Sequence, residues 1–487
     1  MLIIRSIEEA KTYLKQNPIP IYFVSPTNFN LIGIEKWVSQ FKSISLIDCY
    51  DQENPSVFSP KISGSPVFQS SEDINEYLLT HKEVVEQFHL SPKNKVLFLF
   101  LNDAIEARCQ KLGLDLCASP VSLIKQIDNK VIATQIGNEA GVPSVPNALE
   151  KVNSYQDLLK ISKAHNLGQD IVVQTAYGDS GKTTFFISSE EMYGAVSDQI
   201  EAEEVVKVMK HINCANVAIE ACLTSCGIAV GAPVTELVGF KELTPYKGGW
   251  CGNELYPTAF TQKTHQAIHQ KTIQLGQALQ KRGYKGYFEL DYLIDRDTGE
   301  IYLGEINPRI TGITAITNLS NFCQEVFPLF LFHLLTFLDV TLEIDIDHYN
   351  QLVLKQGTQS MFGQLIIKYC DSDLKVITEA PATGIYQIDP NGTLIFVRKS
   401  NTPRDIQSED EIFFLRIMKD SDYAYKSGDL GVVFVHQVLK SDIQELTVFA
   451  KKCISAIQSG FKMRELTREE KVLVSRYQNP GSIKAFS

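Results

Sequence analysis

The sequence predicts an α/β protein with three parts: an N-terminal parallel α/β domain, a middle module with antiparallel strands, and a C-terminal β-rich domain. Helix-like and strand-like runs alternate over roughly the first 118 residues, which is typical of a parallel sheet covered by helices. Two strand-like runs at residues 286–293 and 301–309 flank a turn containing Asp295 and Gly299, and so predict an antiparallel hairpin. From about residue 350 the runs are mostly strands. A chain of 487 residues has room for about three such domains.

The N-terminal domain, expected over residues 1–118, is predicted from apolar runs between turn signals. Strands are expected at residues 20–24, 45–49 and 95–101, and helices at 31–41 and 103–112. No G-x-G-x-x-G motif follows an early strand, so the domain lacks the fingerprint of dinucleotide binding. A further helix is expected near residues 128–140, because Gly141 and Pro143 supply a stop signal.

The C-terminal part, expected over residues 346–487, is predicted to be rich in strands. These are expected at residues 360–368, 384–388, 393–397 and 430–437, followed by a helix at 442–458. Before this part, the apolar run at residues 326–340 is interrupted by Pro328, His333 and Asp339 and is too short to span a bilayer. It therefore predicts a buried helix with His333 in the core.

The composition excludes several classes of function. A net charge of −11 without a block of Lys or Arg argues against a nucleic-acid partner. No charged-then-apolar signal segment opens the chain, so we expect a cytoplasmic protein with no membrane partner. Among the ten cysteines only Cys222 and Cys226 form a tight pair, and no second pair completes a zinc site. Reduced thiols are therefore expected.

The hairpin at residues 286–309 carries side chains suited to a metal ion. Because the side-chain period of a strand is two, Glu289 and Asp291 share one face, and Glu305, Asn307 and Arg309 share another. Asp291, Glu305 and Asn307 are expected to converge, with Glu289 as a weaker candidate. Mg²⁺ prefers such oxygen ligands and is usually held by one or two carboxylates and by nucleotide phosphates. The hairpin predicts a metal–ATP site; the alternative is a hairpin whose carboxylates merely face water.

A second segment, residues 170–187, contains a glycine loop. Residues 176–183 fit a relaxed Walker A pattern, which would indicate a P-loop. A P-loop leads into a helix that binds phosphate at its N-terminus, whereas the β-branched and aromatic residues 183–187 predict a strand. A hairpin whose backbone N–H groups at residues 178–181 cover phosphates fits better. The alternative is a tight turn without a ligand.

These segments, in this order, resemble the ATP-grasp superfamily, and the domain order is most similar to its biotin carboxylase branch. The resemblance implies a two-part ATP-grasp module with antiparallel sheets at residues 119–345, with a glycine-loop subdomain at about 145–220. The implied cofactors are ATP and Mg²⁺, with Mn²⁺ as an alternative metal. Residues 128–146 resemble the first phosphate-lysine helix, 178–182 the glycine loop and 217–223 the adenine-binding hinge strand.

The resemblance also implies roles for individual residues. The metal ligands are Asp291, Glu305, Asn307 and, less firmly, Glu289, and Arg309 is the arginine on the substrate side. The implied ATP-binding residues are Lys130, Gln174, Gly178, Ser180, Gly181, Lys182, Glu220, Ala221 and Leu223.

Two departures from the family pattern bear on the chemistry. The second phosphate lysine falls on Gln174, and Lys182 or Lys241 are candidates to replace it, since phosphoryl transfer needs nearby cations. Biotin carboxylases carry a glutamate base shortly after the arginine, but residues 310–317 contain only Ile, Thr, Gly and Ala. The Asn-Pro-Arg-x-Thr-Gly ending is more similar to carboxylate–amine ligases.

The implied function is therefore an ATP-dependent ligase that forms an amide or peptide bond through an acyl phosphate, with Arg309 and Lys182 as catalytic residues. A biotin carboxylase-like enzyme and a non-catalytic nucleotide-binding regulatory module remain the alternatives. The implied partners are a small carboxylate and an amine, with amino acids as the expected class, and a homodimer is a possible assembly. In the long loop at residues 243–256, Lys247, Trp250 and Asn253 are expected to line the substrate pocket, with a packing role as the alternative for Trp250.

Overall fold

The computed structural model describes residues 2–62, 68–178, 183–441 and 445–474. Its N-terminal sheet has five parallel strands in the order β4-β3-β2-β5-β6. The strands are β2 (Ile21–Ser25), β3 (Phe41–Ser45), β4 (Val57–Phe58), β5 (Lys95–Phe98) and β6 (Asp115–Leu116). The accompanying helices are α1 (Ile7–Gln16), α2 (Ser71–Thr80), α3 (Lys82–Phe88) and α4 (Asp103–Leu112). The expected parallel α/β domain is confirmed, and α4 has the predicted bounds.

One N-terminal prediction is wrong. Residues 31–41 contain no α-helix but two short 3-10 turns, η1 (Phe29–Leu31) and η2 (Ile34–Lys36). Gly33 between them has φ +87°, a left-handed conformation that glycine adopts without strain and that interrupts a helix. The second strand is consequently Phe41–Ser45, earlier than the expected 45–49.

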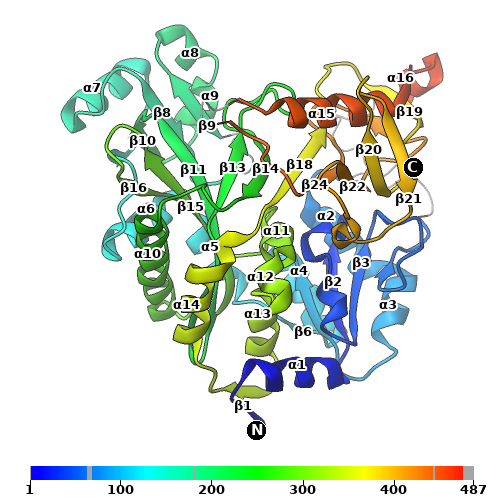
Figure 1. The fold of residues 1–487 in the computed structure, drawn as a ribbon. Coiled ribbons are helices and arrows are strands. Elements are labelled where there is room, and N and C mark those ends of the chain that lie inside the picture. The colour runs from blue at the N-terminus through cyan, green and yellow to red at the C-terminus, as the bar shows by residue number, and fades with distance from the viewer. Residues whose placement is uncertain (1, 63–67, 179–182, 442–444, 475–487) are drawn as a thin grey trace.

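The glycine-loop subdomain is a four-stranded antiparallel sheet in the order β7-β10-β8-β9. Its strands are β7 (Asn147–Glu150), β8 (Ile171–Gln174), β9 (Thr184–Ile187) and β10 (Val206–Lys210), with helices α7 (Tyr155–His165), α8 (Glu190–Gly194) and α9 (Ser197–Glu201). We call this sheet the small sheet. It forms a separate lobe at the upper left of Figure 1.

The large sheet has eleven strands, ten of them in the order β16-β15-β11-β13-β14-β18-β24-β22-β20-β21, and β12 pairs with β11. Its first half comprises β11 (Cys214–Thr224), β12 (Gly227–Val230), β13 (Val234–Val238), β14 (Trp250–Leu255), β15 (Gly286–Asp295) and β16 (Ile301–Asn307). Its second half comprises β18 (Phe362–Lys368), β20 (Gly384–Ile388), β21 (Leu394–Arg398), β22 (Glu411–Arg416) and β24 (Asp429–Val435). Because β14 pairs with β18, the expected border at residues 345/346 divides one continuous sheet.

Several helices cover the first half of the large sheet. They are α10 (Gln262–Lys281), α11 (Thr314–Leu319), α12 (Asn321–Glu325), α13 (Phe330–Phe337) and α14 (Ile346–Gln356). The buried α13 confirms the prediction for the apolar run, and His333 lies in the core, where it accepts from the N–H of Tyr287 at 3.0 Å. The N-terminal strand β1 (Leu2–Ile4) pairs in parallel with β17 (Val340–Leu342), which ties the first residues to this part of the chain.

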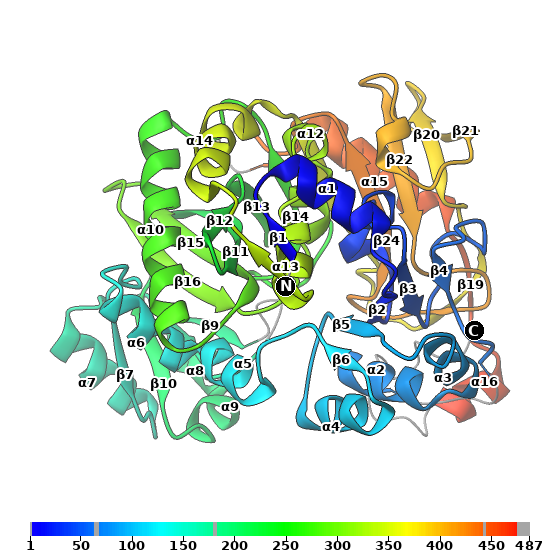
Figure 2. The ribbon, with the colours of Figure 1, turned by 90° about the horizontal axis from the view of Figure 1, so that it is seen from below.

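The helix expected near residues 128–140 is two helices, α5 (Val121–Asp128) and α6 (Lys130–Glu139). Asn129 ends the first and caps the second, because its side chain accepts from the N–H groups of Val131 and Ile132. Figure 2 shows α5 between the small-sheet lobe and the N-terminal domain. The two helices thus meet where three parts of the molecule approach one another.

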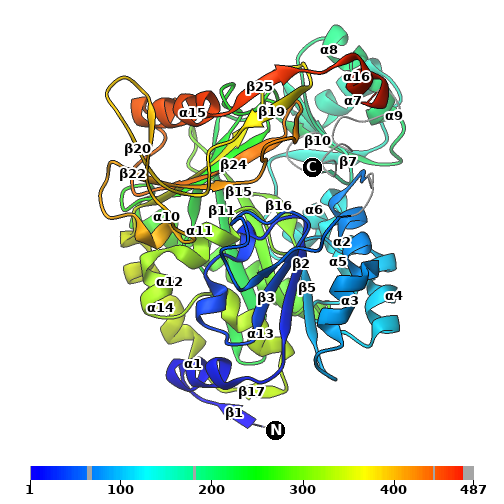
Figure 3. The ribbon, with the colours of Figure 1, turned by 90° about the vertical axis from the view of Figure 1, so that its right-hand side faces the viewer.

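The C-terminal region adds a three-stranded sheet, β23-β19-β25, formed by β19 (Lys375–Glu379), β23 (Tyr423–Ala424) and β25 (Lys462–Glu465). Helix α15 (Val448–Gly460) and helix α16 (Arg468–Val474) complete the described chain, whereas residues 442–444 of the expected helix lie outside it. Figure 3 shows α15 and β25 at the end of the molecule opposite α1. Among the described residues, no helix combines the length and the apolar character needed to cross a bilayer. The cytoplasmic location stays a prediction.

Candidate active site

The hairpin β15–β16 brings its polar side chains together. Asp291 lies opposite Glu305 and Glu289 opposite Asn307 in the antiparallel register, with an irregularity directly after Asp291. The amide of Asn307 donates to the carboxylate of Glu289 at 2.5 Å and to that of Asp291 at 3.5 Å. The convergence of these four side chains follows from the period of two and from the short turn between the strands.

Crowding and burial make these carboxylates harder to ionise. Burial raises the pKa of Asp291 to about 6, and the charge of Glu305 adds to that rise. The pKa of Glu289 is raised well above its ordinary value by burial and then by Asp291. Glu236 on β13, which the sequence analysis did not identify, is affected in the same way by burial and by Asp291. A cation placed here would favour the charged form of all these groups.

The described residues contain no preformed metal cage, because no group of three or more His, Cys, Asp or Glu side chains has the arrangement to hold an ion alone. Mg²⁺ usually takes one or two carboxylates and completes its shell with water and phosphate. Asp291, Glu305 and Asn307 supply oxygen donors of the required type, so the residues present fit the metal.

Lys130 connects the hairpin to the glycine loop. It is the first residue of α6 and is only 4% exposed. Its ammonium group donates to the carbonyl oxygen of Gly178 at 3.0 Å and forms an ion pair with Glu305. Asn129 fixes this position by capping the helix, so the lysine proposed from sequence to bind phosphate lies beside the proposed metal ligands.

The glycine loop joins β8 to β9, which pair from Ile171–Ile187 to Gln174–Thr184. A strand and not a helix follows the loop, so the P-loop alternative is wrong. Gly178 has φ +150°, and a Cβ there would lie 1.9 Å from the hydroxyl oxygen of Thr183. The backbone therefore requires glycine at this position. Ser180, Gly181 and Lys182 lie outside the described residues.

The segment expected to bind adenine does not have the required free groups. Ala221, Cys222 and Leu223 pair with β12 on one side and with β15 on the other, so their backbone hydrogen bonds are already made. Glu220 is completely buried and accepts from Tyr287 at 2.6 Å and from Thr314 at 2.5 Å. We correct this expectation: β11 is a central strand of the large sheet. The sequence of β11 resembles that of a hinge strand because buried strands of either kind are continuous apolar runs.

Glu220 instead belongs to a buried polar network. Burial raises its pKa to about 7, although hydrogen bonds from Thr314 and Tyr287 oppose the rise. Asn318 donates to the Tyr287 hydroxyl at 3.2 Å and also to the carbonyl of Thr314 at 2.8 Å. The network joins β11 and β15 to α11, the helix that follows Arg309, and thereby fixes the chain on the substrate side of the hairpin.

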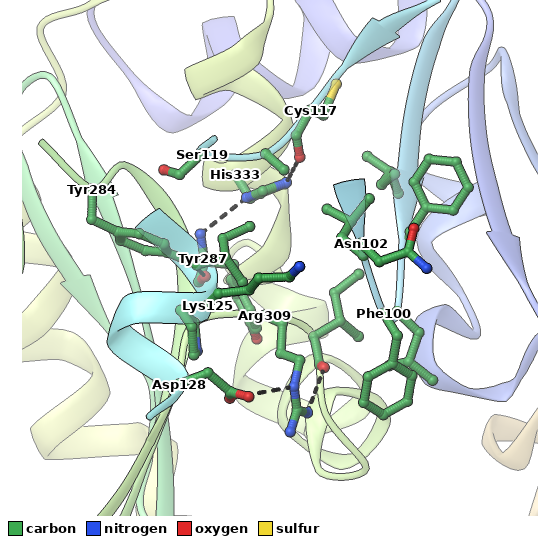
Figure 4. A pocket seen from close by; sticks show the side chains of 18 of the residues that line it. Phe100, Asn102, Cys117, Ser119, Lys125, Asp128, Tyr284, Tyr287, Arg309 and His333 are labelled. Atoms are coloured by element: carbon green, nitrogen blue, oxygen red, sulfur yellow. Dashed lines mark hydrogen bonds and ion pairs between the residues drawn. The ribbon is translucent and has the colours of Figure 1, made fainter. Parts of the chain in front are cut away.

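Arg309 lies between the hairpin and a cavity of about 580 Å³. Its guanidinium group donates to the side-chain oxygen of Asn307 at 2.9 Å and lies 4.8 Å over the ring of Phe100. The distance from its Nε to Asp128 Oδ1 is 3.9 Å. Figure 4 shows Arg309 and Asp128 directed toward each other beside Phe100. A cation and an anion therefore share one wall of this cavity.

The remainder of the cavity wall comes from the N-terminal domain, from α5 and from the residues around the start of β15. It includes the apolar and aromatic side chains of Leu97, Phe98, Leu99, Ile124, Tyr284 and Tyr287, and also the charged side chains of Glu72, Lys125 and Lys285. His333 also lines it, between the carbonyl of Cys117 and the N–H of Tyr287 (Figure 4), and burial lowers its pKa to about 4. The histidine is therefore neutral and structural at neutral pH.

The three residues expected to line the substrate pocket from the long loop are not among those that line this cavity. Trp250 donates to Asn253 at 2.9 Å, and a Cβ on Gly312 would lie 2.3 Å from the Trp250 ring. Trp250 thus packs on the turn that follows Arg309. The ammonium group of Lys247 lies 4.4 Å from the ring centre of Phe186 on β9, so this residue links the two lobes.

No family model and no curated protein matches this chain. Solved structures do match it across most of its length. A biotin carboxylase domain dimer of 2-oxoglutarate carboxylase from Hydrogenobacter thermophilus, in complex with MgADP, ADP and bicarbonate, aligns with a TM-score of 0.58 at 10% identity over 92% of this chain and 91% of that chain. L-amino acid ligase from Bacillus licheniformis aligns with 0.55 at 15% identity over 92% and 99%.

Carboxyaminoimidazole ribonucleotide synthase from Aspergillus clavatus, complexed with ATP, aligns with a TM-score of 0.52 at 12% identity over 86% of this chain and 94% of that chain. Identities this low bear on the fold alone. The chain therefore has the fold shared by the ATP-grasp enzymes, as its motifs indicated.

Proposed function

We propose that this protein is an enzyme, an ATP- and Mg²⁺-dependent carboxylate–amine ligase that makes an amide or peptide bond through an acyl phosphate. The observation that carries this proposal is the position of Arg309. Its guanidinium group contacts Asn307 on the hairpin and lines the cavity at the same time. A carboxylate held there would lie beside the proposed metal and phosphate site.

The nucleotide site is proposed from charges on two sides. Asp291, Glu305 and Asn307 would hold Mg²⁺, which would supply positive charge to neutralise the charge that develops during phosphoryl transfer. Lys130 lies next to Glu305 and to the loop at Gly178, where it would contact the phosphates directly. The fold neighbours determined with ATP or MgADP support ATP and Mg²⁺ as the cofactors.

The acid would bind through Arg309, whose planar fork matches a carboxylate in two parallel hydrogen bonds. The oxygen of the acid attacks the γ-phosphorus, ADP leaves, and an acyl phosphate forms. The amine then attacks the carbonyl carbon, phosphate leaves, and the nitrogen releases a proton to solvent. No base is needed for the first step, because a carboxylate is already ionised at pH 7.

An amino acid is the substrate class that the cavity favours. An amino acid carries one carboxylate and one ammonium group, and Arg309 and Asp128 provide the opposite charges on one wall, 3.9 Å apart. The volume of about 580 Å³ and the aromatic and aliphatic wall suit an apolar side chain. The likeness to an L-amino acid ligase supports the same class.

The carboxylase alternative lacks a base for bicarbonate. Residues 310–317 contain no acid, and Glu220, the nearest buried carboxylate to α11, is completely buried and accepts hydrogen bonds from Tyr287 and Thr314. A non-catalytic regulatory module is disfavoured because the hairpin carboxylates, Lys130 and Arg309, which the proposed reaction requires, are all present. A homodimer, the assembly of the carboxylase domain compared above, stays a prediction for this chain.

Phosphate release from ATP tests the proposal. The wild-type protein is incubated with ATP, Mg²⁺ and pairs of amino acids, and separately with biotin and bicarbonate. We expect release that requires both an acid and an amine, and a condensed product of the matching mass. Carboxybiotin formation, or ATP cleavage that no acid–amine pair stimulates, would contradict the ligase assignment.

A further inference from the structure

Lys207, the second residue of β10, has a buried amino group that forms no ion pair among the described residues. It is 1% exposed, and its ammonium group donates to the hydroxyl of Ser144 at 3.1 Å. No carboxylate in the described part of the chain forms an ion pair with it. Burying an ammonium group against a single neutral hydroxyl is unfavourable, because the lost hydration is not replaced. An anion placed beside this lysine would therefore stabilise its charged form.

The position of Lys207 in the small sheet indicates which anion that is. Lys207 lies directly opposite Gln174 in the antiparallel pairing of β10 with β8. Residues at opposite positions project from the same face of a sheet, with Cβ atoms about 5 Å apart. Gln174 is the position at which the ATP-grasp resemblance implies a phosphate-binding lysine. The amide of Gln174 donates to Thr184 at 3.1 Å and its side-chain oxygen has no partner in the described structure.

The charges around Lys207 place it at the proposed phosphate site. Lys130 and Glu305 are the two charged groups that act on it, one from α6 and one from the metal-binding hairpin. The pKa of Lys207 is lowered to about 7, mainly by burial; the charge of Glu305 opposes this decrease and the charge of Lys130 adds to it. Two neighbouring ammonium groups destabilise each other unless an anion lies between them. A polyphosphate is such an anion.

We propose that Lys207 replaces, from the adjacent strand, the phosphate-binding lysine that is missing at Gln174, and that it binds the nucleotide phosphates together with Lys130. The inference rests on the proposed function, because it requires ATP as the ligand. Of the two candidates named from the sequence, Lys241 is exposed, and Lys182 lies outside the described residues and stays a prediction.

Moving the lysine back across the strand pair tests this inference. Four proteins are compared: wild type, Lys207→Met, Gln174→Lys/Lys207→Met, and Lys163→Met as a control that removes an exposed lysine from α7. Methionine keeps the length of the side chain and removes a buried charge, so Lys207→Met is expected to fold, with thermal unfolding as the check. Calorimetry measures the Kd of each protein for MgATP and for AMP, which lacks the β- and γ-phosphates.

We expect Lys207→Met to weaken MgATP binding by on the order of 10- to 100-fold, the size of a lost charge-assisted hydrogen bond, while AMP binding and the control stay within about threefold of wild type. The double variant should regain most of the affinity for MgATP. An unchanged MgATP affinity in Lys207→Met, an equal loss for AMP, or a double variant as weak as the single one would overturn the inference. A wild-type protein that binds no ATP would instead contradict the proposed function.

Discussion

The two walls of the candidate site carry ionisable groups of opposite sign, and the pKa values of these groups are shifted in opposite directions. On the large-sheet wall, Glu236, Glu289 and Asp291 are buried together, and their pKa values are raised. On the facing wall, Lys207 from the small sheet is buried near Lys130, and its pKa is lowered. In both walls, burial therefore favours the uncharged form of these side chains. The ion pair between Lys130 and Glu305 connects the two walls.

This difference supports the ligand proposed above. A metal cation would stabilise the ionised form of the buried carboxylates, and a phosphate anion would stabilise the charged form of Lys207. A magnesium–nucleotide complex would supply both kinds of charge at once. Neither ATP alone nor Mg²⁺ alone would relieve both walls.

The largest effect on ATP turnover is expected from substitution of Glu305, the carboxylate that forms the ion pair with Lys130. Glu305→Gln should reduce ATP turnover by on the order of 1000-fold, because it removes the charge that pairs with Lys130 and is proposed to bind the metal, while the shape of the side chain is kept. Coupled ADP production at saturating Mg²⁺ measures this. Glu300→Gln, at an exposed position before β16, is the matched control and should retain wild-type turnover. Normal ADP production by Glu305→Gln would contradict the proposal that the β15–β16 hairpin binds the metal.

Substitution of Arg309 separates acid binding from nucleotide binding. Arg309→Ala should lower acid-dependent phosphate release by roughly 100-fold, since the carboxylate loses its bidentate partner. The Kd for MgATP should change by less than about threefold, because Arg309 contacts Asn307 and the cavity and not the lysine wall. Arg309→Lys, which keeps the charge but not the fork, should recover only part of the activity. A parallel loss of nucleotide affinity would show that Arg309 belongs to the phosphate site.

A smaller effect is expected from the cationic wall. Lys130→Ala should weaken MgATP binding by about 10- to 100-fold, with turnover at saturating ATP less affected, because the contact is present in both ground state and transition state. Calorimetry and steady-state kinetics distinguish these effects. Lys160→Ala on α7 removes an exposed lysine and serves as the control. Unchanged nucleotide affinity would leave Lys130 with only its structural contacts to Glu305 and Gly178.

The smallest effect concerns stability and comes from the network behind the cavity. The pKa of Glu220 in the folded protein, about 7, lies above its value of about 4.3 in an unfolded chain, so the folded state binds more protons between these pH values. The contribution of Glu220 to stability is thus complete below about pH 4 and is lost as the pH rises through 7.

Glu220→Gln has no such titration. The stability difference between the variant and wild type should therefore shift in favour of the variant by up to about 3 kcal/mol between pH 4.5 and pH 8. Urea unfolding at the two pH values measures the shift. A difference that is independent of pH would mean that Glu220 is ionised in the folded protein throughout this range.

The two walls also differ in how far they could be predicted from the sequence. The hairpin carboxylates lie on strands joined by one short turn, so the period of two and the turn residues were sufficient to place Asp291 beside Glu305. Lys207 and Glu236 were missed because their partners come from strands that are distant in the chain. Helices α8 and α9 lie between Gln174 and Lys207, and no local pattern encodes the pairing of β8 with β10.

Most of the N-terminal and C-terminal elements were predicted because they are apolar runs between turn signals. The helix expected at residues 31–41 is interrupted at Gly33, which has a left-handed backbone and where an added Cβ would lie 3.2 Å from Leu319 in α11. The prediction that Glu220 binds adenine was wrong because β11 has strand neighbours on both sides, and the sequence of β11 alone does not reveal these neighbours. In both cases tertiary context determined the outcome.

Titration of the wild-type protein with ATP, once with Mg²⁺ and once with EDTA, tests the complementarity of the two walls most directly. We predict that calorimetry will show binding of ATP in the presence of Mg²⁺ and an affinity at least about tenfold lower in its absence, because the carboxylate wall then faces the phosphates without a cation between them. Equal affinity under the two conditions, or no binding of MgATP at millimolar concentration, would contradict the account.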